Sequence, residues 1–178
     1  MKTTVKGCMQ LDIFKDAVLA AGEKGLGRKI RYASVLEPSE PEEIRELVDC
    51  EDRIFVTGFF GARDDSDKQA AVIRELADKK AAGLIVLYVG QIVKSLEDNV
   101  LEAANEAELP LIVFKDSSAE YGTVLNAIEE KVIYGDNFDN SLISNTIFHL
   151  LDFDKHANFQ SALKKAAISN GFQMVLLN

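Results

Sequence analysis

Four short apolar runs recur along the chain, and amphipathic stretches long enough to form helices separate them. The runs cover residues 30–36, 53–58, 83–88 and 110–114. Alternation of apolar strands with amphipathic helices is typical of βα units that feed a parallel sheet. The pattern therefore predicts an α/β fold with a parallel, doubly wound sheet of four to five strands and helices on both faces.

The stretches around the runs predict five helices. We expect these helices to cover residues 11–21, to begin at Pro41, at the acidic run 64–67 and at Ser95, and to extend from about residue 118 to 132. The first rests on apolar residues at helical spacing, and the others on capping residues and a proline suited to a first helical turn. Pro110 indicates either the beginning of a strand or an edge strand.

The sequence beyond residue 134 departs from this alternation. Gly135, Asp136 and Asn137 mark a predicted domain boundary. We expect a helix over 142–151, a second helix over about 158–169 and the beginning of a strand over 171–178. On this interpretation, residues 1–134 form one domain, and residues 135–178 form a C-terminal helical appendage that leads into a further domain.

Composition and charge narrow the functional classes. Apolar residues make up 47% of the chain, which supplies a core and excludes general disorder. The net charge of −9 makes this segment a poor partner for a phosphate backbone. The chain has neither an apolar run of about 20 residues nor a secretory signal, so we expect a cytoplasmic protein.

The residue types that bind metals or form disulfides are sparse and scattered. Cys8 and Cys50 are far apart with no partner motif, and we expect both to be reduced. His149 and His156 lie near the C-terminus, where we expect solvated side chains rather than a metal site. No nucleophile–base set and no carboxylate pair marks a catalytic site. We therefore expect no catalytic residue, no metal and no cofactor.

A glycine-rich stretch over residues 22–29 is similar to a phosphate-binding loop only at first sight. Such a loop needs a lysine and then a hydroxyl residue after its last glycine, and it must open a helix. Arg28 and then Lys29 and Ile30 follow Gly27 instead, and the stretch leads into a predicted strand. A tight connection between two elements is the favoured interpretation.

Three groups of polar or aromatic residues lie near predicted strand ends. The segment 57–61 reads Thr-Gly-Phe-Phe-Gly, whose backbone N–H groups and rings either face a ligand or form a turn that fills the core or an interface. The acidic run 64–67 either binds Mg²⁺ or caps a helix, and capping is favoured. The basic residues are each a candidate for an anionic group, although a surface ion pair is the commoner role: Arg28, Arg31, Arg63 and Lys115.

Several blocks resemble, in order, the N-terminal domain of PucR-type (purine catabolism regulator-like) bacterial transcription regulators. They are the segment 21–37, the strand and turn 53–58, Ala81-Ala82-Gly83-Leu84, and Leu109-Pro110-Leu111-Ile112. The second block has Val56 where this family usually has a threonine. Residues 148–152 and 162–175 resemble the linker helix and the beginning of the cyclase-like domain that follows in such regulators.

The resemblance implies a cytoplasmic, non-catalytic sensor domain that responds to a small-molecule effector, with a purine-related compound as one candidate. It also implies a homodimer and a helix-turn-helix DNA-binding region outside this chain. We expect the effector to bind at the carboxyl ends of the strands, near Arg28, Glu37, Thr57, Gly58 and Phe59. Two alternatives stay open: a ligand-free assembly module that uses the helix 142–151 and an exposed Phe59-Phe60 pair, and a small α/β enzyme that acts on a phosphorylated compound.

Overall fold

The computed structural model describes residues 3–37, 40–115 and 119–134 of the chain. Contacts divide the chain into two units, Met1–Gly135 and Asp136–Asn178, and every described residue belongs to the first. The helices expected over 142–151 and 158–169 and the strand expected at 171–178 lie outside the described residues. The assignment of 135–178 to an appendage and a following domain therefore stays a prediction.

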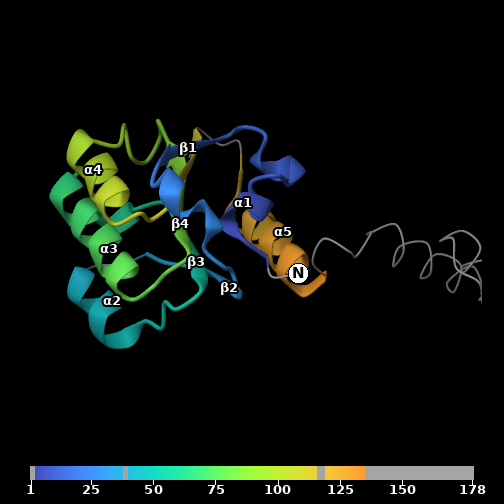
Figure 1. The fold of residues 1–178 in the computed structure, drawn as a ribbon. Coiled ribbons are helices and arrows are strands. Elements are labelled where there is room, and N and C mark those ends of the chain that lie inside the picture. Colours follow the sequence, from blue (N-terminus) through green and yellow to red (C-terminus); the bar gives the residue numbers. More distant parts are fainter. Residues whose placement is uncertain (1–2, 38–39, 116–118, 135–178) are drawn as a thin grey trace, which may run out of the picture. The chain divides into compact units, whose positions relative to one another are not determined.

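A five-stranded sheet forms the centre of the described unit, with the strand order β1-β5-β4-β3-β2 (Figure 1). The strands are β1 (Ala17–Ala21), β2 (Tyr32–Val35), β3 (Arg53–Thr57), β4 (Gly83–Val89) and β5 (Leu111–Lys115). Strands β2 to β5 run parallel to one another, and β1 pairs antiparallel with β5. The predicted α/β class is confirmed, and each of the four apolar runs overlaps a strand.

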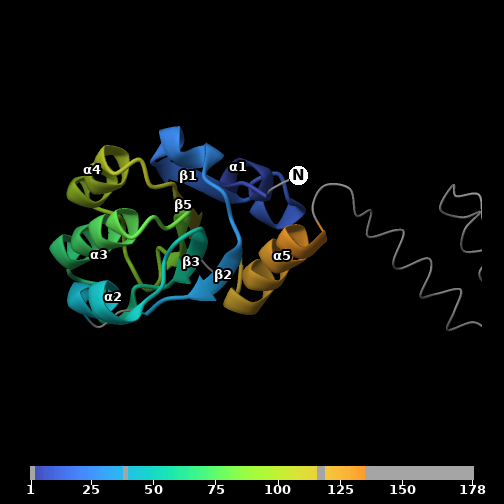
Figure 2. The ribbon, with the colours of Figure 1, turned by 60° about the horizontal axis from the view of Figure 1, so that its bottom comes forward.

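Helices cover both faces of the sheet, as Figures 1 and 2 show. Three of them share one face: α2 (Pro41–Leu47), α3 (Ser66–Asp78) and α4 (Asp98–Glu106). The short α1 (Val5–Cys8) and the longer α5 (Tyr121–Tyr134) lie on the other face. This arrangement confirms the doubly wound prediction.

Burial on both faces explains why the central strands are almost wholly apolar. Successive side chains of a strand point to opposite faces. Accordingly, Phe55 and Leu84 join the buried cluster that includes α3 and α4, whereas Ile54 and Ile85 join the cluster that includes α1 and α5. A strand covered by helices on both sides needs apolar residues at every position. Because of this requirement, β3 and β4 could be predicted from the sequence.

The prediction of a helix over residues 11–21 is wrong. Residues Asp12–Phe14 form a single 3₁₀ turn, and Ala17–Ala21 form the edge strand β1. β1 pairs with β5, from Ala17 opposite Phe114 to Ala21 opposite Leu111. This pairing satisfies the backbone hydrogen-bonding groups along one side of β5, which would be exposed to solvent if residues 17–21 formed a helix. Tertiary pairing therefore outweighs the local helical spacing.

Helix beginnings agree with the sequence in two cases and differ in a third. Pro41 is the first residue of α2, and Asp65 caps α3 by accepting from the Lys68 backbone N–H at 2.9 Å. Ser95 is not a cap, because α4 begins at Asp98 with Glu97 in the N-cap position. Pro110 directly precedes β5, which is an interior strand, so Pro110 marks the beginning of a strand and not an edge.

Candidate functional site

The carboxyl ends of the parallel strands meet on one side of the sheet, where the carboxylate of Glu37 accepts several hydrogen bonds. Glu37 follows β2, and its Oε1 accepts from the Gly58 N–H at 2.6 Å and from Thr57 Oγ1 at 3.3 Å, while its Oε2 accepts from the Phe60 N–H at 3.1 Å. The Tyr121 hydroxyl at the beginning of α5 also donates to Oε1. We call Glu37, Thr57, Gly58, Phe60 and Tyr121 the Glu37 clamp.

The clamp joins three segments that are distant in sequence: the end of β2, the turn after β3 and the first residue of α5. Burial, and after it the hydrogen bond to Glu37, raises the pKa of Tyr121 far above that of a free phenol. The Tyr121 hydroxyl therefore keeps its proton and stays a donor to the carboxylate. The Tyr88 ring, at the end of β4, lies 6.0 Å from the Tyr121 ring, centroid to centroid, and extends the cluster to a third strand.

Glycine is required in the turn because the clamp is crowded there. A Cβ at Gly58 would lie 2.7 Å from a ring carbon of Phe60 and 2.9 Å from the Tyr121 hydroxyl. Such contacts are shorter than real Cβ atoms make, so a larger residue would displace one of these rings.

The two neighbouring phenylalanines have different surroundings. Phe59 is 1% exposed, belongs to the core cluster and adopts a left-handed φ of 53°. Its N–H donates to Thr57 Oγ1 at 2.9 Å. Phe60 is 47% exposed. Core filling is therefore the outcome for Phe59, and Phe60 is the ring that a ligand or partner could reach.

Arg28 does not lie with the other four predicted ligand-binding residues. It precedes β2 and therefore lies at the amino ends of the parallel strands. There its guanidinium donates to Ala81 O at 2.7 Å and to Ala107 O at 2.9 Å. Partial burial lowers the pKa of Arg28, against the influence of Glu108. The placement of Arg28 at the carboxyl edge was wrong; its hydrogen bonds join the connections that lead into β4 and β5. Whether Glu37, Thr57, Gly58 and Phe59 bind a ligand stays a prediction.

The other candidate charges lie mostly in ordinary surface contacts. Arg63 Nε forms an exposed ion pair with Asp64 at 3.3 Å. The guanidinium carbon of Arg31 lies 5.5 Å from the Tyr32 ring centroid. Within the described ranges, no group of three or more His, Cys, Asp or Glu side chains is placed to hold a metal ion. Asp65 caps α3 through its bond to the Lys68 N–H.

Both cysteines are buried and neither forms a disulfide, as predicted. Burial raises the pKa of the Cys50 thiol, which keeps it protonated. Among the helices in the described part of the chain, none is long and apolar enough to cross a membrane.

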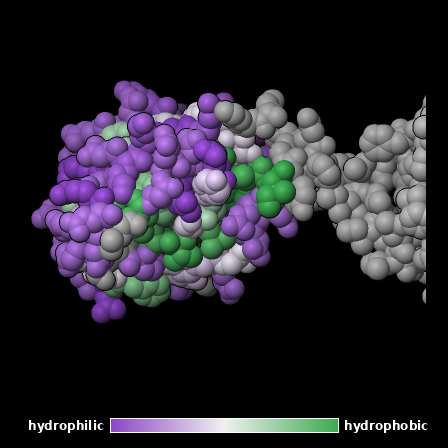
Figure 3. Space-filling model, turned by 90° about the horizontal axis from the view of Figure 1, so that it is seen from below, coloured by the Kyte–Doolittle hydropathy of each residue, from purple (hydrophilic) through white to green (hydrophobic). Residues whose placement is uncertain are grey.

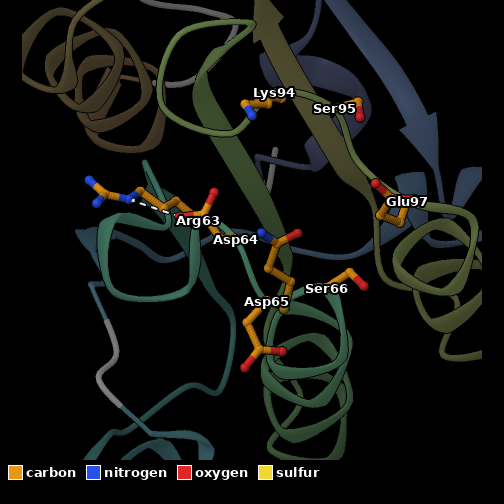
Figure 4. Close-up of a pocket in the computed structure, with 8 residues that line it drawn as sticks. Arg63, Asp64, Asp65, Ser66, Lys94, Ser95 and Glu97 are labelled. Atoms are coloured by element: carbon orange, nitrogen blue, oxygen red, sulfur yellow. Dashed lines mark hydrogen bonds and ion pairs between the residues drawn. The ribbon is translucent and has the colours of Figure 1, made fainter.

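A second feature of the carboxyl edge lies on the face of the sheet covered by α3 and α4. It is a cavity of about 230 Å³ between the segment that enters α3 and the loop that follows β4 (Figure 4). Its lining residues are Arg63, Asp64, Asp65, Ser66, Gln69, Lys94, Ser95 and Glu97. Reasoning from the sequence missed Gln69, Lys94 and Glu97, although the last two follow β4, where the carboxyl-edge rule would have placed them.

Comparison with protein families decides the affiliation. The sequence model of the purine catabolism regulatory protein-like family matches residues 7–132, which is more than half of the chain. The chain belongs to this family. No curated protein matches the sequence.

The matched region of this regulator-family domain contains all five strands and most of α5. The blocks that resemble the family fall at the end of β1 through β2, along β3, and at the beginnings of β4 and β5. Val56, which replaces a usual threonine, is fully buried in the core. The hydroxyl that takes part in the clamp is that of the next residue, Thr57, so the departure at Val56 leaves the clamp intact.

Proposed function

We propose that this domain is a cytoplasmic, non-catalytic sensor of a bacterial transcription regulator of the purine-catabolism type. A small-molecule effector, for which a purine-related compound is one candidate, binds at the carboxyl edge of the sheet. Binding shifts the population between two arrangements of the domain. The observation that carries the proposal is the Glu37 clamp, because it links that edge directly to α5.

In this proposal α5 has two positions, one with the Glu37 clamp formed and one with it broken. Glu37 accepts from both the β3 turn and Tyr121, so any ligand that competes for Glu37 or displaces the turn loosens α5 from the sheet. Helix α5 is the last described element, and the chain continues beyond it. A change in α5 is therefore the step by which occupancy reaches the remainder of the regulator. In this proposal, DNA contact belongs to a region outside these 178 residues, consistent with the net charge of −9.

A ligand screen with two readouts tests the proposal. The full chain is heated with purines, ureides and other small metabolites, and each stabilising compound is then tested by backbone hydrogen exchange. A true effector should add about 2.7 kcal/mol of stability at a hundredfold excess over its Kd and change exchange in α5. Helix α4, on the other face of the sheet, is the internal control. The sensor proposal is wrong if no compound stabilises the folded protein, or if those that bind leave α5 unchanged.

A second candidate, assembly without a ligand, is favoured by the outer surface of β2. This edge strand exposes Tyr32 to 49% and Val35 to 47%, and Phe60 beside it is also half exposed. Figure 2 shows β2 at the front of the molecule, and Figure 3 shows apolar surface on that side. Unpaired backbone groups on an edge strand are a template for pairing with a second copy.

Val35→Asp tests this candidate against a matched control. Val18 lies on β1, the opposite edge strand, and is 50% exposed, so Val18→Asp introduces the same charge at an equally accessible edge position. If β2 joins two copies, light scattering should show a halved mass for Val35→Asp and the parent mass for Val18→Asp. Retention of the parent mass by both variants would reject the β2 interface. The helix 142–151, which the sequence suggested as another interface, lies outside the described residues.

A further inference from the structure

We propose that the cavity between α3 and the loop after β4 binds a small molecule that carries both an amino group and a carboxylate, as an amino acid does. Its assignment as a regulatory site rests on the proposed function, but the binding itself does not. The volume of about 230 Å³ lies below the roughly 300–1,000 Å³ of pockets for drug-sized ligands. A compact metabolite fits this size, whereas a nucleotide does not.

Gln69 supplies the first argument, because it holds a buried acceptor with no donor. The residue is 2% exposed and lines the cavity. Its Nε2 donates to Ala62 O at 2.7 Å, which fixes the orientation of the amide, since the opposite orientation would put two oxygens together. The remaining atom, Oε1, makes no hydrogen bond among the described residues. Buried acceptors are rarely left unpaired, so an N–H group of a ligand is the expected partner.

Lys94 and Glu97 supply the second argument, because they bring opposite charges to the same cavity from one loop. Asp65 is engaged as the cap of α3, and Arg63 is paired with Asp64. Neither Lys94 nor Glu97 has an ion-pair partner in the part of the chain that the structure describes. Figure 4 shows both side chains on the cavity side opposite the beginning of α3.

A molecule with both groups matches these features together. Its ammonium group can donate to Gln69 Oε1 and pair with the carboxylate of Glu97. Its carboxylate can pair with Lys94, on the side of the cavity opposite Asp65. A molecule with only the carboxylate would leave Gln69 Oε1 and Glu97 without a partner. A molecule with only the amine would leave Lys94 without one.

Three probes of similar size separate these contributions. L-Alanine carries both groups, propionate carries the carboxylate alone, and ethylamine carries the amine alone. Each is titrated into the ¹⁵N-labelled full chain, and the resonances of the Gln69 side-chain amide and the Lys94 and Ser95 backbone amides are followed by NMR. We expect saturable shifts with L-alanine and at least ~10-fold weaker binding of either single-group probe, since a charge-assisted hydrogen bond is lost.

Variants add a second, independent readout. Lys94→Ala and Gln69→Leu should each weaken L-alanine binding by at least ~10-fold. Lys6→Ala removes an exposed lysine on α1, on the other face of the sheet, and should leave binding unchanged. If Gln69→Leu does not fold, Lys94→Ala and the comparison of probes decide the question.

The outcomes separate this site from the wider proposal. Shifts that propionate alone reproduces, or the absence of shifts at Gln69 and Lys94, would overturn the assignment and leave a cavity that holds water. An effector found by the screen that alters α5, together with the absence of L-alanine shifts at Gln69 and Lys94, would overturn this site but support the sensor. L-Alanine binding at Gln69 that leaves α5 exchange unchanged would support the site and deny it a part in signalling.

Discussion

Gly22→Ala is expected to lower the free energy of unfolding by at least about 3 kcal/mol. Gly22 follows β1 with a left-handed φ of 74°, which side-chain-bearing residues rarely adopt. A Cβ there would lie 2.0 Å from the backbone oxygen of Leu109 and 2.8 Å from the nitrogen of Pro110. These are backbone atoms at the entry to β5, so they cannot move aside without disturbing the interior of the sheet.

Chemical denaturation of Gly22→Ala and Gly27→Ala gives the measurement and its control. Gly27 lies in the same connection, but a Cβ there would meet nothing within 4 Å and φ is not in the left-handed region. We expect the Gly27 variant to differ from the parent by no more than about 0.5 kcal/mol. Equal losses in the two variants would show that the close approach to Leu109 is not what makes Gly22 necessary.

The glycine stretch also shows what the sequence can and cannot predict. Arg28 stands directly after Gly27 where a phosphate-binding loop needs a lysine, and no hydroxyl residue follows it directly; together with the predicted strand that comes next, this was enough to disfavour such a loop, because that chemistry depends on local spacing. The actual reason for Gly22 lies at residues 109–110, more than eighty positions away. Non-local packing of this kind leaves no periodic signal, so the sequence predicts a connection but not the contact that the connection makes.

Some strands could likewise be predicted from the sequence and others could not. Strands β3 and β4 were predicted because burial on both faces requires an unbroken apolar run. Strand β1 was missed because its apolar residues also fit a helix, and only the open edge of β5 selects the extended form. The local sequence pattern therefore predicts strands that are buried in the interior of the sheet. The conformation of an edge strand depends instead on the strand that it pairs with.

Chain order could have improved the prediction of the site. Arg28 precedes β2 and Glu37 follows it, so the two residues must lie at opposite edges of a parallel sheet, as the structure shows. Glu37, Thr57 and Gly58 follow adjacent parallel strands and come together as expected. Tyr121 was missed because nothing local marks the first residue of α5 as a partner of Glu37, and that pairing depends on how α5 crosses the sheet.

Glu37→Ala is expected to lower the free energy of unfolding by about 2 kcal/mol. The variant leaves the Gly58 and Phe60 N–H groups and the Tyr121 hydroxyl without their acceptor. Glu37 is an exposed residue, so water replaces part of this loss, and the value rests on the hydrogen bonds alone. Glu51→Ala is the matched control, because within residues 3–37, 40–115 and 119–134 Glu51 makes only an exposed ion pair with Lys80 at 3.7 Å, which is worth at most about 1 kcal/mol.

A double-mutant cycle with Tyr121→Phe then shows whether the clamp acts as a unit. Tyr121→Phe alone removes the phenol's hydrogen bond and should cost about 1 kcal/mol. Because Glu37 and Tyr121 are bonded to each other, the loss in the double variant should be smaller than the sum of the single losses. Strict additivity would mean that α5 is held to the sheet independently of Glu37. In that case the carboxyl edge would have no direct link to the helix through which the domain is proposed to signal.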